Sequence, residues 1–210
     1  MLEGENMRSK GRFQTTRFAL IVLAFCCVAT FSTINMARSS TTVRAANCPS
    51  TCGSYNVPGL GARKQQILNT GGNSLDLAIA MMETETMQAN YKYGDGKSGD
   101  SANFGIFKQN WYMLRTSVPQ YKSYGSGSYN AGAALNSNLS WDIQCLHDSQ
   151  NHYGLYKWFG GQRDGQTGLN NPGTADINSY RNGVYWLQSQ IVNGHMYDNV
   201  RFWLTGVPAI

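Results

Sequence analysis

The stretch from Ala80 to Trp111, AMMETETMQANYKYGDGKSGDSANFGIFKQNW, decides how the chain is interpreted. It joins the end of an apolar segment to a glycine-rich segment, and then returns to apolar residues. Four carboxylates fall within 18 positions of this stretch: Glu83, Glu85, Asp95 and Asp100. Because charged residues make up only 14% of the 210 residues, such a concentration of acids points to a functional site.

The residues that lead into the two glutamates predict a buried helix. Apolar side chains recur at helical spacing in SLDLAIAMMETETM, residues 74–87, and Ser74 suits the N-cap. Burial at the end of an apolar helix raises the pKa of a carboxyl group, as a proton donor near neutral pH requires. Glu83 has this setting. Glu85 lies about 200° further around a helix, so we expect it to point away from Glu83 into solvent.

The glycine-rich segment, YKYGDGKSGDSAN at residues 91–103, predicts a short β-hairpin or Ω-like excursion. Water and backbone N–H groups would keep Asp95 and Asp100 ionised there. A neutral acid on a helix that faces a charged base on a loop is the arrangement that glycoside hydrolysis requires. The alternative, in which the aspartates only cap turns, stays open. A calcium loop is disfavoured, because Lys97 and Gly99 stand where an EF-hand places oxygen ligands.

The rest of the chain indicates a mainly helical protein. Residues 104–118 return to helical or mixed apolar spacing, residues 140–159 form an amphipathic segment with Ser140 as its cap, and residues 177–193 predict a further helix. Sustained strand alternation is scarce. We therefore expect the α+β class, mainly helical, with a small β-hairpin element inserted between core helices.

Residues 1–46 differ from the remainder and predict a leader followed by a processed linker. A basic start precedes FALIVLAFCCVATF at residues 18–31, which fits a signal peptide better than a membrane span of about 20 residues. An uncleaved signal anchor is the alternative. Six Lys/Arg against two Glu give this part +4, whereas eleven against ten give residues 47–210 only +1. We therefore expect a secreted, monomeric domain at 47–210 that binds neither nucleic acid nor membrane.

The number of cysteines outside the leader is compatible with a secreted protein that contains a disulfide. Removal of the leader takes Cys26 and Cys27 with it and leaves Cys48, Cys52 and Cys145, enough for one disulfide in an oxidising compartment. Cys48 and Cys52 are close in sequence, but Cys145 could pair with either. The spacing CPSTC lacks the second cysteine pair or the histidines of a zinc site, so we expect no metal and no cofactor.

The order of these features resembles the lysozyme superfamily: a core helix that ends in Glu83-Thr84, a β excursion, then Asn103-Phe-Gly-Ile-Phe. Three sequence segments are more specific: AMMETETM, YKYGDGKSGD and ANFGIFKQNW. Together they are similar to the sequences of glycoside hydrolase family 134, whose members are secreted β-1,4-mannanases with a hen-lysozyme-like fold and an inverting mechanism. The strong similarity covers about residues 75–115. It implies a general acid on the helix and a general base twelve positions later, which selects Glu83 and Asp95 and leaves Asp100 as second choice.

The resemblance thus implies an inverting endo-β-1,4-mannanase. Glu83 would protonate the glycosidic oxygen while Asp95 deprotonates a water on the other face of the sugar, with the carboxyl groups about 6.5–9.5 Å apart. Asn103 stands where hen-type lysozymes carry an aspartate, and an amide cannot act as a carboxylate nucleophile. Proximity suggests six substrate-binding residues, the polar ones by hydrogen bonds and the aromatic ones by stacking: Tyr93, Asn103, Lys108, Gln109, Asn110 and Trp111.

Two other functions fit the same scaffold. The first is a lysozyme or transglycosylase that cleaves peptidoglycan, although a domain of net charge +1 lacks the strong cationic character that helps enzymes reach anionic cell walls. The second is a non-catalytic, secreted carbohydrate-binding protein. Such a protein would need neither Glu83 nor Asp95.

Overall fold

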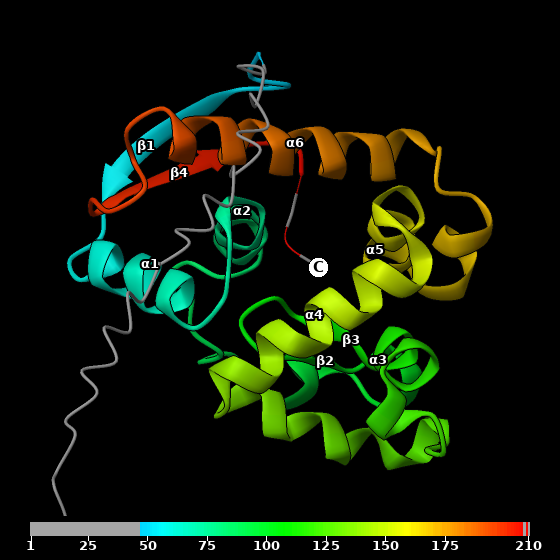
Figure 1. The fold of residues 1–210 in the computed structure, drawn as a ribbon. Coiled ribbons are helices and arrows are strands. Elements are labelled where there is room, and N and C mark those ends of the chain that lie inside the picture. Colours follow the sequence, from blue (N-terminus) through cyan, green and yellow to red (C-terminus); the bar gives the residue numbers. More distant parts are fainter. Residues whose placement is uncertain (1–46, 208, 210) are drawn as a thin grey trace, which may run out of the picture. The chain divides into compact units, whose positions relative to one another are not determined.

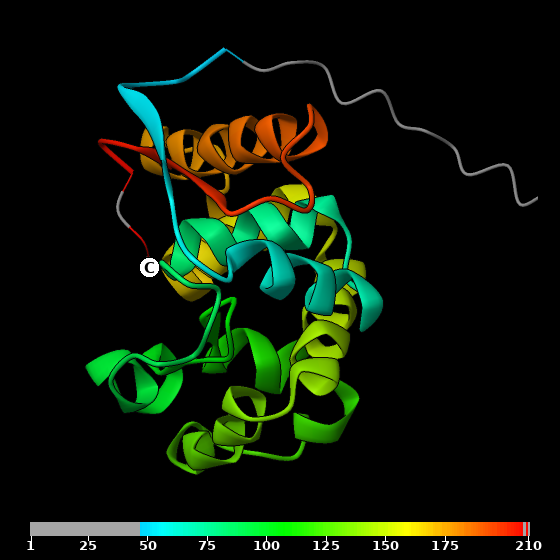
Figure 2. The same cartoon turned by 90° about the vertical axis from the view of Figure 1, so that its left-hand side faces the viewer.

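Helix α2, Ser74–Glu83, lies in the middle of the fold. The computed structural model describes residues 47–207 and 209, so the predicted leader lies outside the described residues. Every side chain of α2 from Asp76 to Glu83 is buried. Helix α6, Ala175–Val192, packs along α2, and both figures show α6 on one side of α2 and the segment around β2 and β3 on the other (Figures 1 and 2).

The remaining elements complete a mainly helical α+β protein, as the sequence predicts. The other helices are α1 (Leu60–Asn69), α3 (Trp111–Ser117), α4 (Leu139–Tyr153) and α5 (Leu155–Asn170). Short 3-10 helices are η1 (Tyr93–Gly96), η2 (Gly99–Ser101), η3 (Pro119–Tyr121) and η4 (Ser126–Asn136). Two antiparallel two-stranded sheets pair β1 (Cys52–Asn56) with β4 (Val200–Leu204), and β2 (Asn103–Phe104) with β3 (Gln109–Asn110). None of the described helices is long and apolar enough to cross a membrane.

The start of α2 corrects the predicted cap by one residue. Asn73, not Ser74, is the N-cap, because its side-chain oxygen accepts hydrogen bonds from the backbone N–H groups of Leu75 and Asp76. Asp76 returns a bond by accepting from the N–H of Asn73, which completes a capping box. The helix ends at Glu83, since Thr84 has an extended backbone.

The β element lies later in the chain than predicted. Residues 93–101 form the turns η1 and η2, and the hairpin occupies residues 103–110, where we expected helical spacing. The turn between β2 and β3 requires left-handed backbone at Gly105 (φ +76°) and at Lys108 (φ +47°). Because lysine seldom adopts positive φ, the sequence does not indicate a tight turn at this position.

The predicted helix at 140–159 is in fact two helices. Asn138 rather than Ser140 caps α4, its side chain accepting from the N–H of Trp141. Gly154 then adopts φ +72° and ψ +146°, which breaks the helical path before α5 begins. The helix predicted at 177–193 is confirmed as α6.

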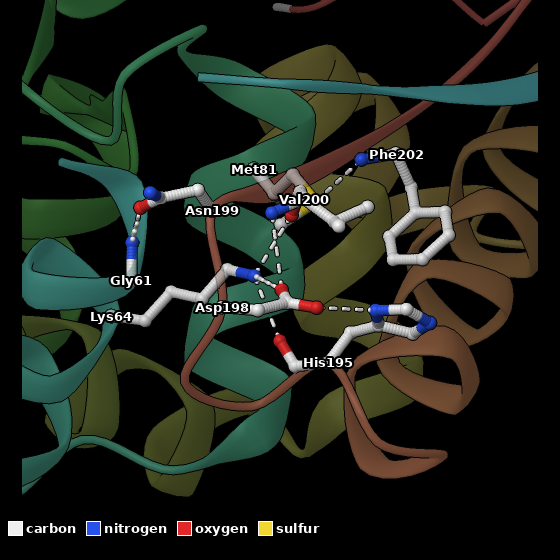
Figure 3. Close-up of polar contacts among 8 residues, drawn as sticks. All are labelled: Gly61, Lys64, Met81, His195, Asp198, Asn199, Val200 and Phe202. Carbon is white, nitrogen blue, oxygen red and sulfur yellow. Dashed lines mark hydrogen bonds and ion pairs between the residues drawn. The ribbon is translucent and has the colours of Figure 1, made fainter. Parts of the chain in front are cut away.

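A buried lysine attaches the segment before β4 to α1. The Lys64 side chain is fully buried, and its Nζ donates to the carbonyls of His195 and Val200 at 2.8 Å and to Asp198 Oδ1 at 3.2 Å (Figure 3). Asp198 Oδ2 also bonds His195 Nδ1 at 2.6 Å. Three hydrogen-bond acceptors therefore offset the free-energy cost of burying the ammonium group. The same bonds fix the turn that leads into β4.

Strand β4 also contacts the end of α2. Arg201 donates to the carbonyl oxygens of Met81 and Glu85, both at 3.0 Å. A guanidinium at a helix C-terminus satisfies carbonyl groups that have no partner within the helix, and it complements the helix dipole.

The cysteines that follow the predicted leader are now assigned. Cys48 and Cys52 form a disulfide, which decides between the pairings that the sequence left open, and Cys145 is a buried free thiol.

Candidate active site

Glu83 is the last residue of α2 and is buried, with 3% of its surface exposed. The hydroxyl of Tyr180, on α6, donates to Glu83 Oε1 at 2.5 Å. Burial, together with the adjacent Glu83 carboxylate, raises the pKa of Tyr180 well above its ordinary value. The phenol therefore remains protonated and serves as a permanent hydrogen-bond donor to Glu83.

Asp95 lies in η1, in the left-handed region at φ +60°. Nζ of Lys108, at the end of the hairpin turn, lies 3.2 and 3.1 Å from its two carboxylate oxygens. Asn103 Nδ2 approaches Oδ2 at 3.5 Å, and Lys97 Nζ lies 3.8 Å from the same oxygen. Strained backbone held by surrounding contacts is typical of functional sites. Here the contacts fix a carboxylate whose charge is stabilised by ammonium groups.

Tyr91 lies in the segment between α2 and η1. Its hydroxyl donates to the carbonyl of Gly105 at 2.6 Å, and Lys108 Nζ lies 5.1 Å from its ring centre. Its pKa is raised, first by burial and then by the negative charges of Asp142, Asp95 and Glu83. Glu83 and Asp95 therefore both lie within electrostatic range of this phenol.

The hairpin turn is held from behind by α4 and α5. The fully buried Asp142 accepts from the N–H of Ile106 and from Gln109 Nε2, both at 2.7 Å, and burial raises its pKa to about 8. Gln162 Nε2 donates to two backbone carbonyls of the turn, one of them that of Lys108, at 3.0 Å. These contacts place the lysine that binds Asp95.

Gly105→Ala tests this support. A Cβ at position 105 would overlap the Asp142 carboxyl, and the backbone there has φ +76°. We expect the substitution to lower the free energy of unfolding by about 2–4 kcal/mol, from overlap and backbone strain together. Thermal or urea unfolding measures the loss. Gly125→Ala is the matched control, because a Cβ there meets nothing within 4 Å, and equal stability of the two variants would contradict the prediction.

The other two carboxylates are engaged elsewhere. Glu85 is exposed, as predicted, and accepts from the hydroxyl of Tyr55 at 3.0 Å. Its exposure does not come from its angle on the helix, as the sequence suggested, because α2 ends before Glu85. Both oxygens of Asp100 accept from Arg115 of α3, at 2.6 and 2.7 Å, and this arginine lowers the pKa of Asp100. Asp100 is thus tied to α3, whereas Asp95 is bonded to Lys108 of the hairpin turn.

The six candidate substrate-binding residues differ from one another in exposure and in the residues they contact. Tyr93 keeps 48% of its surface exposed next to Asp95. Asn103 and Gln109 are buried and bonded to Asp95 and Asp142. Trp111 is fully buried in the core, so its ring has no face left for a sugar and the stacking role predicted for it is not supported. The remaining two are Lys108, the partner of Asp95, and Asn110, which caps α3.

A polar pocket of about 380 Å³ adjoins this site on the α5 side. Helix α5 departs from helical geometry at Asp164 and Gly165, and this irregular turn forms one wall. Glu83 and Asp95 do not line the pocket, but Lys97, the neighbour of Asp95, does. The lining residues are Lys97, Asp100, Ser101, Asn110, Tyr112 and the run 162–166.

Three supporting residues were not found from the sequence: Tyr180, Asp142 and Gln162. Each lies 33 or more positions from the residue it contacts, and no local motif marks it. Within residues 47–207 and 209, the structure contains no group of three or more His, Cys, Asp or Glu side chains that could hold a metal ion.

The comparisons with known proteins agree with this geometry. No curated protein matches the chain. A family model described as glycosyl hydrolase family 134 matches residues 61–206, which span α1 to β4 and include every residue of the site. Because the match covers well over half of the chain, the protein belongs to glycosyl hydrolase family 134 and is a glycoside hydrolase.

Proposed function

We propose that the protein is a secreted endo-β-1,4-mannanase with a lysozyme-like fold and an inverting mechanism, in which Glu83 is the general acid and Asp95 the general base. The observation that carries the proposal is the contrast between the two carboxyl groups around Tyr91. Glu83 is buried and accepts from a neutral phenol, with the Arg163 cation within electrostatic range, whereas Asp95 is only partly buried and is bonded directly to the Lys108 ammonium. Such a difference in environment supports Glu83 as the acid and Asp95 as the base.

The two environments suit a single displacement. Glu83 passes its proton to the glycosidic oxygen, the bond from the anomeric carbon to that oxygen breaks, and the leaving sugar departs with a hydroxyl group. Asp95 accepts a proton from a water molecule whose oxygen attacks the anomeric carbon from the opposite face. Asn103, an amide bonded to Asp95, orients this carboxylate and cannot itself attack the sugar.

The pocket beside α5 supports a neutral, hydroxyl-rich substrate. Two cations (Lys97 and Arg163) and two anions (Asp100 and Asp164) line it, so its charges balance. Side-chain amides and hydroxyls supply donors and acceptors between them, and Tyr112 adds an aromatic ring. Mannan as the polymer rests on the sequence resemblance to the family's mannanases, and secretion rests on the leader composition.

Digestion of linear β-1,4-mannan alongside peptidoglycan tests the substrate. We expect soluble manno-oligosaccharides from mannan and no lysis of peptidoglycan. Lysis of cell wall without mannan cleavage would favour the lysozyme-type alternative, and binding of mannan without products would favour the non-catalytic alternative. NMR of the first-formed product tests the mechanism, because inversion of a β-linkage yields the α-anomer first. An initial β-anomer would contradict a single displacement.

A further inference from the structure

The contact between Tyr180 and Glu83 joins α6 to the end of α2 within the core. Tyr180 is fully buried, and its ring is held in place by neighbours on α5. Phe159 meets the ring edge-on with centroids 5.9 Å apart, and the Arg163 guanidinium lies 5.6 Å from its centre. Arg163 is in turn bonded to Asp176 at 2.7 and 3.1 Å. The phenol therefore has one defined position from which its hydroxyl reaches Oε1 of Glu83.

Titratable and charged groups on three other segments contact Glu83 or act on it electrostatically. Tyr180 approaches it from α6, the Arg163 cation acts on the site from α5, and Tyr91 lies in the segment that follows α2. Lys108 of the hairpin lies over the Tyr91 ring and binds Asp95. Tyr180 combines complete burial with a direct hydrogen bond to a Glu83 oxygen.

We propose that Tyr180 is a positioning residue for Glu83: its hydroxyl donates to Oε1 and fixes the rotation of the carboxyl group that gives its proton to the substrate. This inference rests on the proposed acid role of Glu83. When the carboxyl group gives its proton to the glycosidic oxygen, Glu83 becomes a carboxylate and its bond from Tyr180 becomes charge-assisted. The contact strengthens as the reaction proceeds, so it lowers the barrier rather than tightening substrate binding.

Tyr180→Phe removes the hydroxyl and leaves the ring. We expect kcat on linear mannan to fall about 10–100-fold, the scale of a lost hydrogen bond to a charged group, while KM changes less than about twofold. The alkaline limb of the pH profile should move about one pH unit upward, since losing a donor disfavours the ionised form. Tyr185→Phe is the control, because Tyr185 lies on the same helix and also meets Phe159 edge-on, at 5.5 Å.

Carbon-13 NMR tests the contact independently of activity. The chain contains four glutamates, Glu3, Glu5, Glu83 and Glu85, so δ-¹³C-glutamate labelling gives few signals and Glu83→Gln assigns the one of interest. In Tyr180→Phe we expect the Glu83 signal to titrate about one pH unit higher than in the wild type, with Glu85 unchanged. Tyr185→Phe should leave both signals unchanged.

The outcomes separate the two proposals. An unshifted Glu83 titration in a folded Tyr180→Phe protein overturns the positioning role, as does an unchanged kcat when the wild type cleaves mannan. If the wild type does not cleave mannan, the proposed function fails, and the NMR titration still decides whether Tyr180 controls the Glu83 carboxyl. Thermal unfolding of each variant confirms that the comparison is made between folded proteins.

Discussion

Glu83→Gln is expected to lower kcat on linear mannan by about 10³-fold, the effect of removing a general acid. The amide keeps the size of the side chain and can still accept from Tyr180, so the fold and KM should be nearly unchanged. The loss should shrink on an aryl mannoside with a good leaving group, because such a group departs without protonation. Initial rates on both substrates provide the measurement.

Glu85→Gln is the matched control for this experiment. Glu85 lies two positions away, is exposed, and contacts Tyr55 rather than the site. We expect it to retain wild-type turnover. If Glu83→Gln and Glu85→Gln had similar rates on mannan, the assignment of the acid would be wrong.

Asp95→Asn is expected to lower kcat on linear mannan by roughly 10³-fold, as Glu83→Gln does, but the loss should depend differently on the leaving group of the substrate. The variant cannot activate water, and a better leaving group does not replace that function, so the loss should persist on the aryl mannoside. This contrast with Glu83→Gln distinguishes the base from the acid. The uncharged amide also releases Lys108 from its ion pair, so the substitution should be accompanied by an unfolding measurement.

Asp148→Asn, on α4, is the matched control for Asp95, since its carboxylate contacts Gln144 on the same helix. We expect it to be fully active. Near-normal turnover in Asp95→Asn together with a large loss in Asp100→Asn would move the base to Asp100. The bidentate contact of Asp100 with Arg115 argues for the opposite result.

The elements that the sequence predicted well are those whose signal is local. Helices α2 and α6 follow from apolar periodicity. The ends of α6 were placed within two residues, whereas α2 ends at Glu83, four residues before the end of the predicted segment at 74–87. The hairpin at 103–110 was misplaced because its turn depends on a lysine at positive φ, held by Asp142 and Gln162 from distant helices. Tertiary contacts there override local preference.

In the candidate site, too, local sequence signals predicted some residues, and others depend on contacts between distant segments. Burial at a helix end distinguished Glu83 from Glu85, but only family spacing chose Asp95 over Asp100. Tyr180, 97 positions from Glu83, could not be identified because nothing near it in the sequence reports the contact. Position along the chain also could not show that Trp111 enters the core while Tyr93 stays exposed.

The pairing of β1 with β4 has a consequence for how this protein is made. Residue Cys52 lies opposite Leu204, so the first and last strands of the catalytic unit meet across about 150 residues of intervening chain. Loop closure of this length is entropically costly and belongs to the late, slow steps of folding. A chain emerging from the ribosome cannot close this sheet until β4 has been synthesised. Strand β1 therefore remains without its partner strand while all the helices between the two are made.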